Sequence, residues 1–189
     1  MEVLGIFTAF GLSASAGLNA YIPLLIVALL ARFTNLITLR APWDTLSSWW
    51  IIGILVVLSL VEFFADKFPA VNHINDAIQT FVRPAAGAVA FAASANVITD
   101  IHPILAMGMG LLVAGGVHAV KAGAVRPAVT AATGGAGNVP VSILEDLTST
   151  LISILAVVIP VVIACLLVLL TAAIIWWFWR RSKRTAAAH

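Results

Sequence analysis

Long apolar runs, separated by short polar segments, make up most of the chain. A helix needs about 20 apolar residues to cross the hydrocarbon core of a bilayer, which is about 30 Å thick. We therefore predict an all-α integral membrane bundle, a single domain over residues 1–184, with about six crossing segments at 3–33, 49–65, 84–98, 102–120, 127–140 and 151–179. The first segment either tilts or is broken at Gly17 and Asn19, and the third and fifth are short.

One polar stretch between the second and third segments has the pattern of an amphipathic helix beginning at Pro69. Apolar residues recur on one face at helical spacing, and polar residues occupy the other. The two faces are Val71, Ile74, Ile78, Phe81 and Val82 against Asn72, His73, Asn75, Asp76 and Gln79. We expect this helix either to lie along the membrane interface or to pack under the bundle.

Basic residues favour one side of this arrangement. The last segment ends in aromatic residues 176–179 and a basic cluster, which is typical of a cytoplasmic end. If all six segments cross, the N-terminus is cytoplasmic too, and the inner side holds eight basic residues against two outside. These are Lys67, Arg83, Lys121, Arg126, Arg180, Arg181, Lys183 and Arg184 against Arg32 and Arg40. We expect a multi-pass protein of the bacterial cytoplasmic membrane with both termini in the cytoplasm.

Composition supports the membrane assignment and excludes several classes of protein. Hydrophobic residues form 62% of the chain and charged residues 10%, against about 45–50% and about 25% in average globular proteins. The net charge of +2 is too small for a nucleic-acid binder. One cysteine, Cys165, excludes an intrachain disulfide and a Cys-rich metal site. We expect no cleavable signal peptide, and we interpret residues 185–189 as an added tail.

A short motif recurs along the chain. Val82-Arg83-Pro84-Ala85 reappears as Val125-Arg126-Pro127-Ala128, and each copy opens a segment of small residues. A looser version, residues 15–19, lies in the first segment. In the six-segment arrangement all three copies lie on parallel helices, which suggests repeated helix hairpins of the kind found in transporters. Chance similarity among so many Ala and Gly residues is the alternative.

Two carboxylates are the first candidate site. Glu62 and Asp66 are four residues apart and share a helix face, so together they could bind a cation or relay protons. The structural alternative is an ion pair with the basic residues nearby. Those form the second candidate, a gate or anion-binding group made of Arg83, His118, Lys121 and Arg126.

A third candidate is a substrate or ion pathway between broken helices. Asn19 should lie near the middle of the first segment, where its amide must find a partner. Gly134, Gly135, Gly137 and Asn138 form a loose backbone that either exposes polar backbone groups to a substrate or makes a tight turn at the outer surface. Glu145 follows Ser142 at the spacing of a capping box.

Four segments of the chain resemble a family of small bacterial membrane proteins known only as a domain of unknown function. They are residues 11–25 (GLSASAGLNAYIPLL), 61–67 (VEFFADK), 73–80 (HINDAIQT) and 83–88 (RPAAGA). The resemblance runs from about Gly11 to Leu170 and implies an integral membrane domain of about six helices, without an activity. A fainter likeness links the chain to the lysine exporter superfamily, although the Pro-Gly-Pro run of that group is absent from the first segment.

These observations favour a small transporter or channel for a small ion or metabolite, coupled to protons through Glu62. Its partners would be the lipid bilayer and the solute, and it would act as a homo-oligomer or a compact monomer. No residue spacing indicates a metal, a cofactor or catalysis, so we expect no enzyme. The alternatives are a flippase or scramblase for a phosphorylated lipid, held by Arg83 and Arg126, and a scaffold that transports nothing. A solidly packed bundle with a fully paired Glu62 and no polar cavity would favour the scaffold.

Overall fold

The computed structural model describes residues 2–67, 69–95 and 101–186, and every regular element in these ranges is helical. The predicted all-α fold is therefore confirmed. The elements are α1 (Glu2–Leu18), α2 (Tyr21–Phe33), the short η1 (Trp43–Ser47), α3 (Trp49–Ala65), α4 (Pro69–Ala95), α5 (Pro103–Val120), η2 (Lys121–Val125), α6 (Arg126–Thr133) and α7 (Asn138–Ala186).

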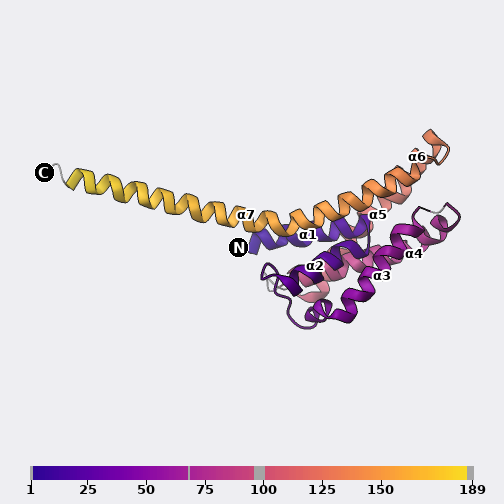
Figure 1. The fold of residues 1–189 in the computed structure, drawn as a ribbon, viewed down its shortest axis with the longest axis horizontal. Coiled ribbons are helices and arrows are strands. Elements are labelled where there is room, and N and C mark those ends of the chain that lie inside the picture. Colours follow the sequence, from indigo (N-terminus) through magenta and orange to yellow (C-terminus); the bar gives the residue numbers. More distant parts are fainter. Residues whose placement is uncertain (1, 68, 96–100, 187–189) are drawn as a thin grey trace.

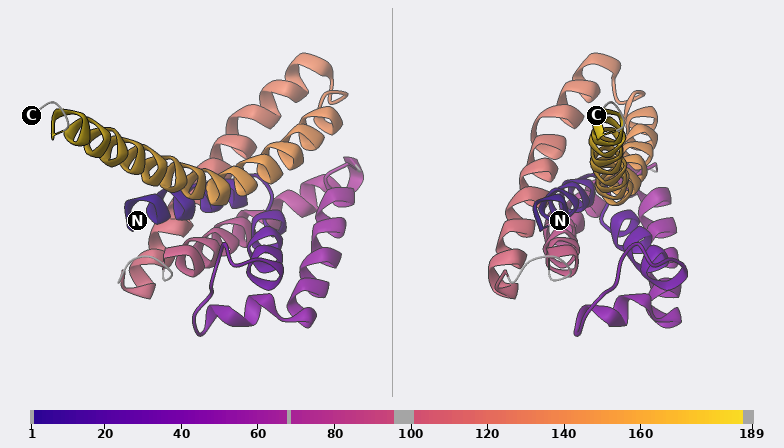
Figure 2. Two further views of the ribbon diagram at one scale, coloured as in Figure 1. Left: turned by 60° about the vertical axis from the view of Figure 1, so that its left-hand side comes forward. Right: turned by 90° about the vertical axis from the view of Figure 1, so that its left-hand side faces the viewer.

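The first predicted segment is a pair of helices rather than one. The chain turns back after Leu18, so that α2 leads away from the end of α1 at a steep angle (Figures 1 and 2). The direction of the chain keeps alternating from helix to helix (Figure 1). It reverses between α3 and α4, between α4 and the continuous run of α5, η2 and α6, and between that run and the first part of α7. The predicted break near Asn19 is thus confirmed, and it reverses the chain.

The fifth predicted segment, 127–140, does not cross separately. Its first half, α6, continues the direction of α5, and the chain turns back over residues 134–137 into α7 (Figure 1). The stretch Pro103–Thr133 is 31 residues long and Asn138–Pro160 is 23, and both are apolar and long enough to cross a membrane. Three shorter apolar helices accompany them, Gly5–Leu18, Tyr21–Phe33 and Trp49–Ala65. These features indicate a membrane protein.

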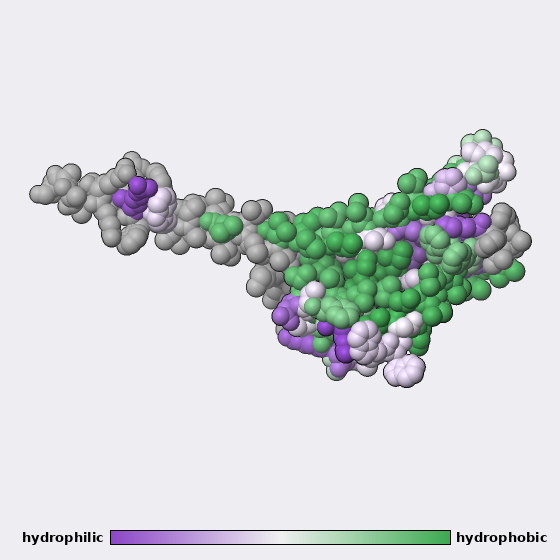
Figure 3. Space-filling view, viewed as in Figure 1, coloured by the Kyte–Doolittle hydropathy of each residue, from purple (hydrophilic) through white to green (hydrophobic). Residues whose placement is uncertain are grey.

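Helix α4 unites the predicted amphipathic helix with the third segment, and Pro84 lies inside it. The end of that segment, residues 96–98, lies outside the described residues. Among the described side chains, the polar Asn75 and Gln79 are buried, whereas Ile78 and Phe81 are exposed. The apolar face therefore points outward, as suits a helix that meets lipid rather than water. Figure 3 shows the same organisation over the bundle, where hydrophobic residues fill the middle and hydrophilic residues gather toward two ends.

Helix α1 is the centre of the bundle, with α5 on one side and α7 on the other (Figure 2), and it also contacts α4. Small residues make this packing possible, as in other membrane helices. A Cβ on Gly17 would lie 2.5 Å from the Ala114 carbonyl oxygen of α5. Hydroxyls hold α1 to α7, because Ser15 Oγ lies 2.8 Å from Ser149 Oγ and 2.6 Å from Ser153 Oγ.

The fold changes two predictions that depended on helix direction. The copies of the repeated motif lie on helices of opposite direction, because α4 packs antiparallel to α5 and α6 continues α5 (Figure 1). Repeated parallel hairpins are therefore wrong. Lys67, Arg83, Lys121 and Arg126 lie near the end of the bundle that α1 runs toward, so they do not share a side with the N-terminus. The extra reversal between α1 and α2 is the cause.

Candidate functional site

The break between α1 and α2 leaves helix-end backbone groups buried in the protein, where each needs a partner. The Leu18 carbonyl, at the end of α1, accepts a hydrogen bond of 2.9 Å from Lys121 Nζ. The Ala20 amide, just before α2, donates to Glu62 Oε2 at 3.1 Å. Asn19 Oδ1 accepts from the Tyr21 and Ile22 amides at 3.1 Å each, and so caps α2. A cation thus meets the negative end of α1, and a carboxylate meets the positive end of α2.

Around this break lies a buried network, which we call the charged network: Glu62, Asp66, Arg83, Lys121, Arg126 and Glu145. Arg83 and Glu62 are fully buried and pair at 2.9 Å. Arg126 pairs with Asp66 at 2.9 Å and with Glu145 at 3.0 Å. Lys121 pairs with Glu145 at 2.8 Å. Three carboxylates thus face three basic groups, and a fourth carboxylate, Asp76, lies 3.7 Å from Arg126 at the edge of the network.

A π turn brings two of the basic residues into the network. The Arg126 amide donates to the Lys121 carbonyl, five residues back, instead of the usual four. In a regular α-helix, residues five apart point about 140° away from each other, since each residue turns about 100°. The wider turn of η2 places both side chains against Asp66, with Lys121 Nζ at 3.7 Å and Arg126 Nη2 at 2.9 Å. π turns of this kind occur frequently at functional sites.

Further polar groups surround the network. His118 lies between Thr80, 3.2 Å from its Nε2, and Arg83, 3.2 Å from its Nδ1. Asn19 donates to Asp146 Oδ1 at 2.9 Å, and Lys67 pairs with Asp146 Oδ2 at 3.0 Å. The structure therefore brings together the predicted residues Asn19, Glu62, Asp66, Arg83, His118, Lys121 and Arg126.

Asp66 directly follows α3, and its carboxylate contacts all three basic residues of the network. Burial by itself would raise the pKa of this carboxyl, but the nearby positive charges, Lys121 foremost, and a hydrogen bond from Asn75 hold its pKa below the usual range. Asp66 is therefore ionised at neutral pH. A lowered pKa in the folded state stabilises the fold at neutral pH, and this contribution is lost as the pH falls through the folded-state value.

The glycine-rich segment lies apart from the network, contrary to the predicted pathway. Gly134 and Gly135 adopt φ angles of 61° and 91° in the turn between α6 and α7, and Gly134 is exposed. Gly137 donates its amide to Thr133 Oγ1 at 2.9 Å, and Asn138 Nδ2 donates to Thr130 Oγ1 at 3.0 Å. The segment is thus a tight turn, as the alternative held, because the chain reverses here; the structure does not test on which side of the membrane the turn lies.

Sequence reasoning missed three polar residues in and around the network. Glu145 is not a capping residue, since α7 begins seven residues earlier at Asn138. Asn75 donates to Asp66 of the network, and Asp146 binds Asn19 and Lys67 beside it. The available signal was the spacing of polar residues along α7, where Ser142, Glu145, Ser149 and Ser153 fall three or four apart and are all buried.

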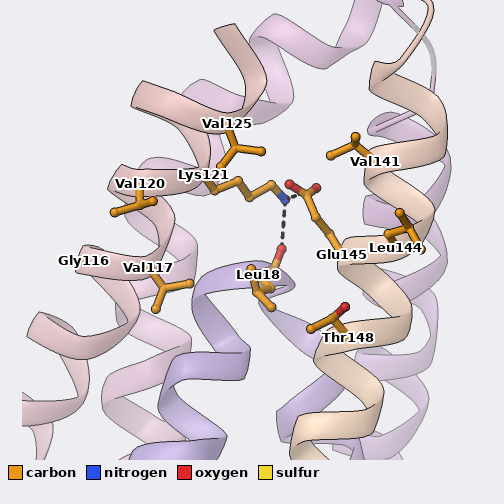
Figure 4. Close-up of a pocket in the computed structure, with 10 residues that line it drawn as sticks. All are labelled: Leu18, Gly116, Val117, Val120, Lys121, Val125, Val141, Leu144, Glu145 and Thr148. Atoms are coloured by element: carbon orange, nitrogen blue, oxygen red, sulfur yellow. Dashed lines mark hydrogen bonds and ion pairs between the residues drawn. The ribbon is translucent and has the colours of Figure 1, made fainter. Parts of the chain in front are cut away.

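A pocket of about 460 Å³ opens beside the network, between the α5–η2 run and α7. Figure 4 shows Lys121 and Glu145 reaching toward each other across it, with Leu18 at the end of α1 beneath them. Its other walls are mainly apolar: Val117, Val120, Val125, Val141 and Leu144. Pockets of about 300–1,000 Å³ with a few polar groups are typical of small-molecule sites. The bundle is therefore hollowed beside the charged network.

Together the fold and this site define a small bundle of apolar helices, of a kind that indicates a membrane protein, built around a buried charged network. The chain matches the family described as a domain of unknown function (DUF4126) over residues 6–180, and it belongs to that family. The resemblance inferred from the sequence is thereby confirmed, while the fainter likeness to the lysine exporter superfamily stays a prediction. No curated protein and no solved structure matches the chain significantly.

Proposed function

We propose that this protein is a small transporter of the bacterial cytoplasmic membrane that moves a small ion or metabolite. One observation carries the proposal, namely the break between α1 and α2 inside the charged network. In secondary transporters, discontinuous helices present their ends to the substrate and the coupling ion. Here the end of α1 and the start of α2 are held by Lys121 and Glu62, side chains that could exchange partners.

Glu62 is the coupling residue of this proposal. Its carboxylate bonds both the Ala20 amide and the Arg83 guanidinium. A proton on Glu62 would remove the charge that holds Arg83, while the backbone contact to α2 would weaken. Arg83 would then be free to bind an anion or another carboxylate of the network, and the α1–α2 junction would move. Proton binding and opening of the junction would thus be linked.

A scaffold that transports nothing would also pair its buried charges, and the full pairing of Glu62 agrees with that alternative. The pocket beside the network is the observation that favours transport instead: its walls are mainly apolar, but the charged Lys121 and Glu145 form part of them. A static ion network has no need of a cavity at its charged groups. The transporter proposal accounts for both features.

We expect the Glu62→Gln variant to lose proton-gradient-driven flux in proteoliposomes. The amide keeps the shape of the side chain but cannot carry the charge that pairs with Arg83. Flux is to be measured for a panel of ions and small metabolites, with and without a pH gradient. Asp44→Asn is the matched control, because Asp44 is exposed in η1, which most of the length of α3 separates from Glu62.

Both variants need the helical circular dichroism and the elution volume of the unmodified protein. Full flux through Glu62→Gln would reject proton coupling at this residue. Absence of flux for every solute, in the unmodified protein as well, would reject transport of small solutes and leave the lipid and scaffold alternatives.

A second candidate function, transfer of a phosphorylated lipid between leaflets, is supported by the same pocket. Its mainly apolar walls suit an acyl chain, and Lys121 and Glu145 lie where a headgroup would end. Arg83, the predicted headgroup ligand, is fully buried and paired with Glu62, so it does not serve this role in the conformation described.

Filling the pocket with Val120→Trp separates the two functions. If the pocket carries lipid, this variant should lose transfer of a fluorescent phospholipid in vesicles and keep solute flux. Val120 is exposed on the pocket wall, so the larger side chain need not disturb the core. Unchanged lipid transfer in the variant would exclude the pocket as the lipid route.

A further inference from the structure

Helix α7 is too long for one membrane crossing. It has 49 residues and therefore measures about 73 Å at about 1.5 Å per residue, against a hydrocarbon core of about 30 Å. The part up to Pro160 packs in the bundle, where Thr8, Ser15 and Asn19 bind it. The remainder projects beyond the bundle as an arm (Figure 1).

The projecting arm has the sequence of a membrane span. Residues 161–179 carry no charged side chain, and they end in the aromatic cluster 176–179 followed by Arg180 and Arg181. These nineteen residues, all apolar except Thr171, are enough to cross a bilayer, which requires about 17–25. Aromatic residues followed by basic ones are typical of the point where a span leaves the membrane on the cytoplasmic side. An arm of this composition belongs in lipid, not in water.

Pro160 provides a joint where the arm leaves the bundle. Proline has no amide hydrogen, so it cannot bond the carbonyl of Ala156, four residues earlier. Thr8 Oγ1 donates to that carbonyl instead, at 2.7 Å. The helix thus lacks one backbone hydrogen bond at this point, and the Ala156 carbonyl accepts its hydrogen bond from Thr8 of α1 instead. Kinks in helices occur mainly at such prolines.

The distribution of basic residues distinguishes a straight α7 from a bent one. With a straight α7, the C-terminal cluster lies at the end opposite the charged network. The basic residues then divide six to four: Arg32, Arg40, Arg180, Arg181, Lys183 and Arg184 against Lys67, Arg83, Lys121 and Arg126. If the arm crosses back, the C-terminal cluster joins the network side, and the division becomes eight to two. The second division is the one that the positive-inside rule favours.

We propose that α7 divides at Pro160 into two membrane spans, and that residues 161–179 cross back through the bilayer. The C-terminus then lies on the same side as the charged network, in the cytoplasm, and the N-terminus lies on the opposite side. The partner of the arm is the lipid bilayer itself. This proposal differs from the prediction that both termini are cytoplasmic, and it does not depend on transport.

Labelling of single cysteines from one side of the membrane tests the proposal. Cys165→Ala removes the native thiol, and Ser182→Cys then places a probe beyond the arm. Two reference variants report the two ends of the bundle: Thr45→Cys in η1 and Ala136→Cys in the glycine turn, both at exposed positions. A membrane-impermeant maleimide is added to intact cells and to inverted vesicles, and labelling is compared.

The expected result is that Ser182→Cys labels together with Ala136→Cys and opposite to Thr45→Cys. Inverted vesicles should expose Ser182→Cys and Ala136→Cys, and intact cells should expose Thr45→Cys. Labelling of Ser182→Cys together with Thr45→Cys would overturn the proposal, since a straight α7 gives that pattern. Protection of Ser182→Cys from both sides would also overturn it, because the proposal places this residue in water.

Discussion

The Arg83→Met variant is expected to lose about 3–5 kcal/mol of unfolding free energy, the usual cost of leaving one partner of a buried ion pair unpaired. Arg83 is fully buried and binds Glu62 through Nε at 3.1 Å and Nη2 at 2.9 Å. Methionine fills part of the space but supplies neither charge nor hydrogen-bond donor. The measurement is a denaturant titration in detergent micelles, followed by circular dichroism.

Two companion variants show whether the loss comes from the unpaired charge. The double variant Glu62→Leu with Arg83→Met should recover much of it, because replacing both partners of a buried pair by apolar residues is often neutral or stabilising. Arg32→Met is the matched single control, since Arg32 lies at the end of α2 and over the Trp49 ring at 5.0 Å. A loss below about 1 kcal/mol for Arg83→Met, the range of exposed pairs, would contradict the burial described here.

The Gly110→Ala variant is expected to destabilise the contact between α4 and α5. A Cβ at this position would lie 2.6 Å from Phe91 Cβ and 2.8 Å from Ala88 Cα, and closer still to the Gly87 carbonyl oxygen. Backbone atoms cannot rotate away as a flexible side chain can, so the two helices must separate. Overpacking of this kind costs about 1–3 kcal/mol. Thermal unfolding in detergent measures the effect as a lower midpoint.

Gly108→Ala is the control on the same helix, because a Cβ there meets no atom within 4 Å. Alanine favours a helix over glycine by about 1 kcal/mol, so this variant should be unchanged or slightly more stable. Equal unfolding midpoints for the two alanine variants would show that α4 and α5 are not in close contact at Gly110.

The sequence was sufficient for the helical class and for most of the charged network, and less so for the path of the chain. Apolar runs identify helices because burial in lipid requires them, but a run such as 3–33 contains no signal that distinguishes a tilt from a reversal. Asn19 marks the break, yet the direction that the chain takes after the break depends on contacts with Lys121 and Glu62, which lie far away in the sequence. The directions of the helices could therefore not be derived from the sequence. The relative orientation of the repeated motifs and the division of basic residues between the two ends of the bundle depend on these directions, so they could not be derived either.

The site was predictable where charge alone decides the outcome. Glu62 and Arg83 must find partners at membrane depth, whatever the arrangement of the helices. The glycine turn and Glu145 were ambiguous because each fits a common local motif, and the choice depends on where α7 begins. The π turn was not predictable, since no residue of the segment Lys121–Val125 requires it.

The π turn of η2 has a consequence for how this segment can change in evolution. It amounts to one inserted residue in an otherwise regular helix, and the wider turn absorbs that residue so that Arg126 still faces Asp66. Loss of one residue between Lys121 and Arg126 would restore the ordinary turn and leave the two basic side chains four residues apart, about 40° from each other on the helix. Relatives that keep the pair should therefore have either four residues between them, with a π turn, or three residues, with a regular α-helix.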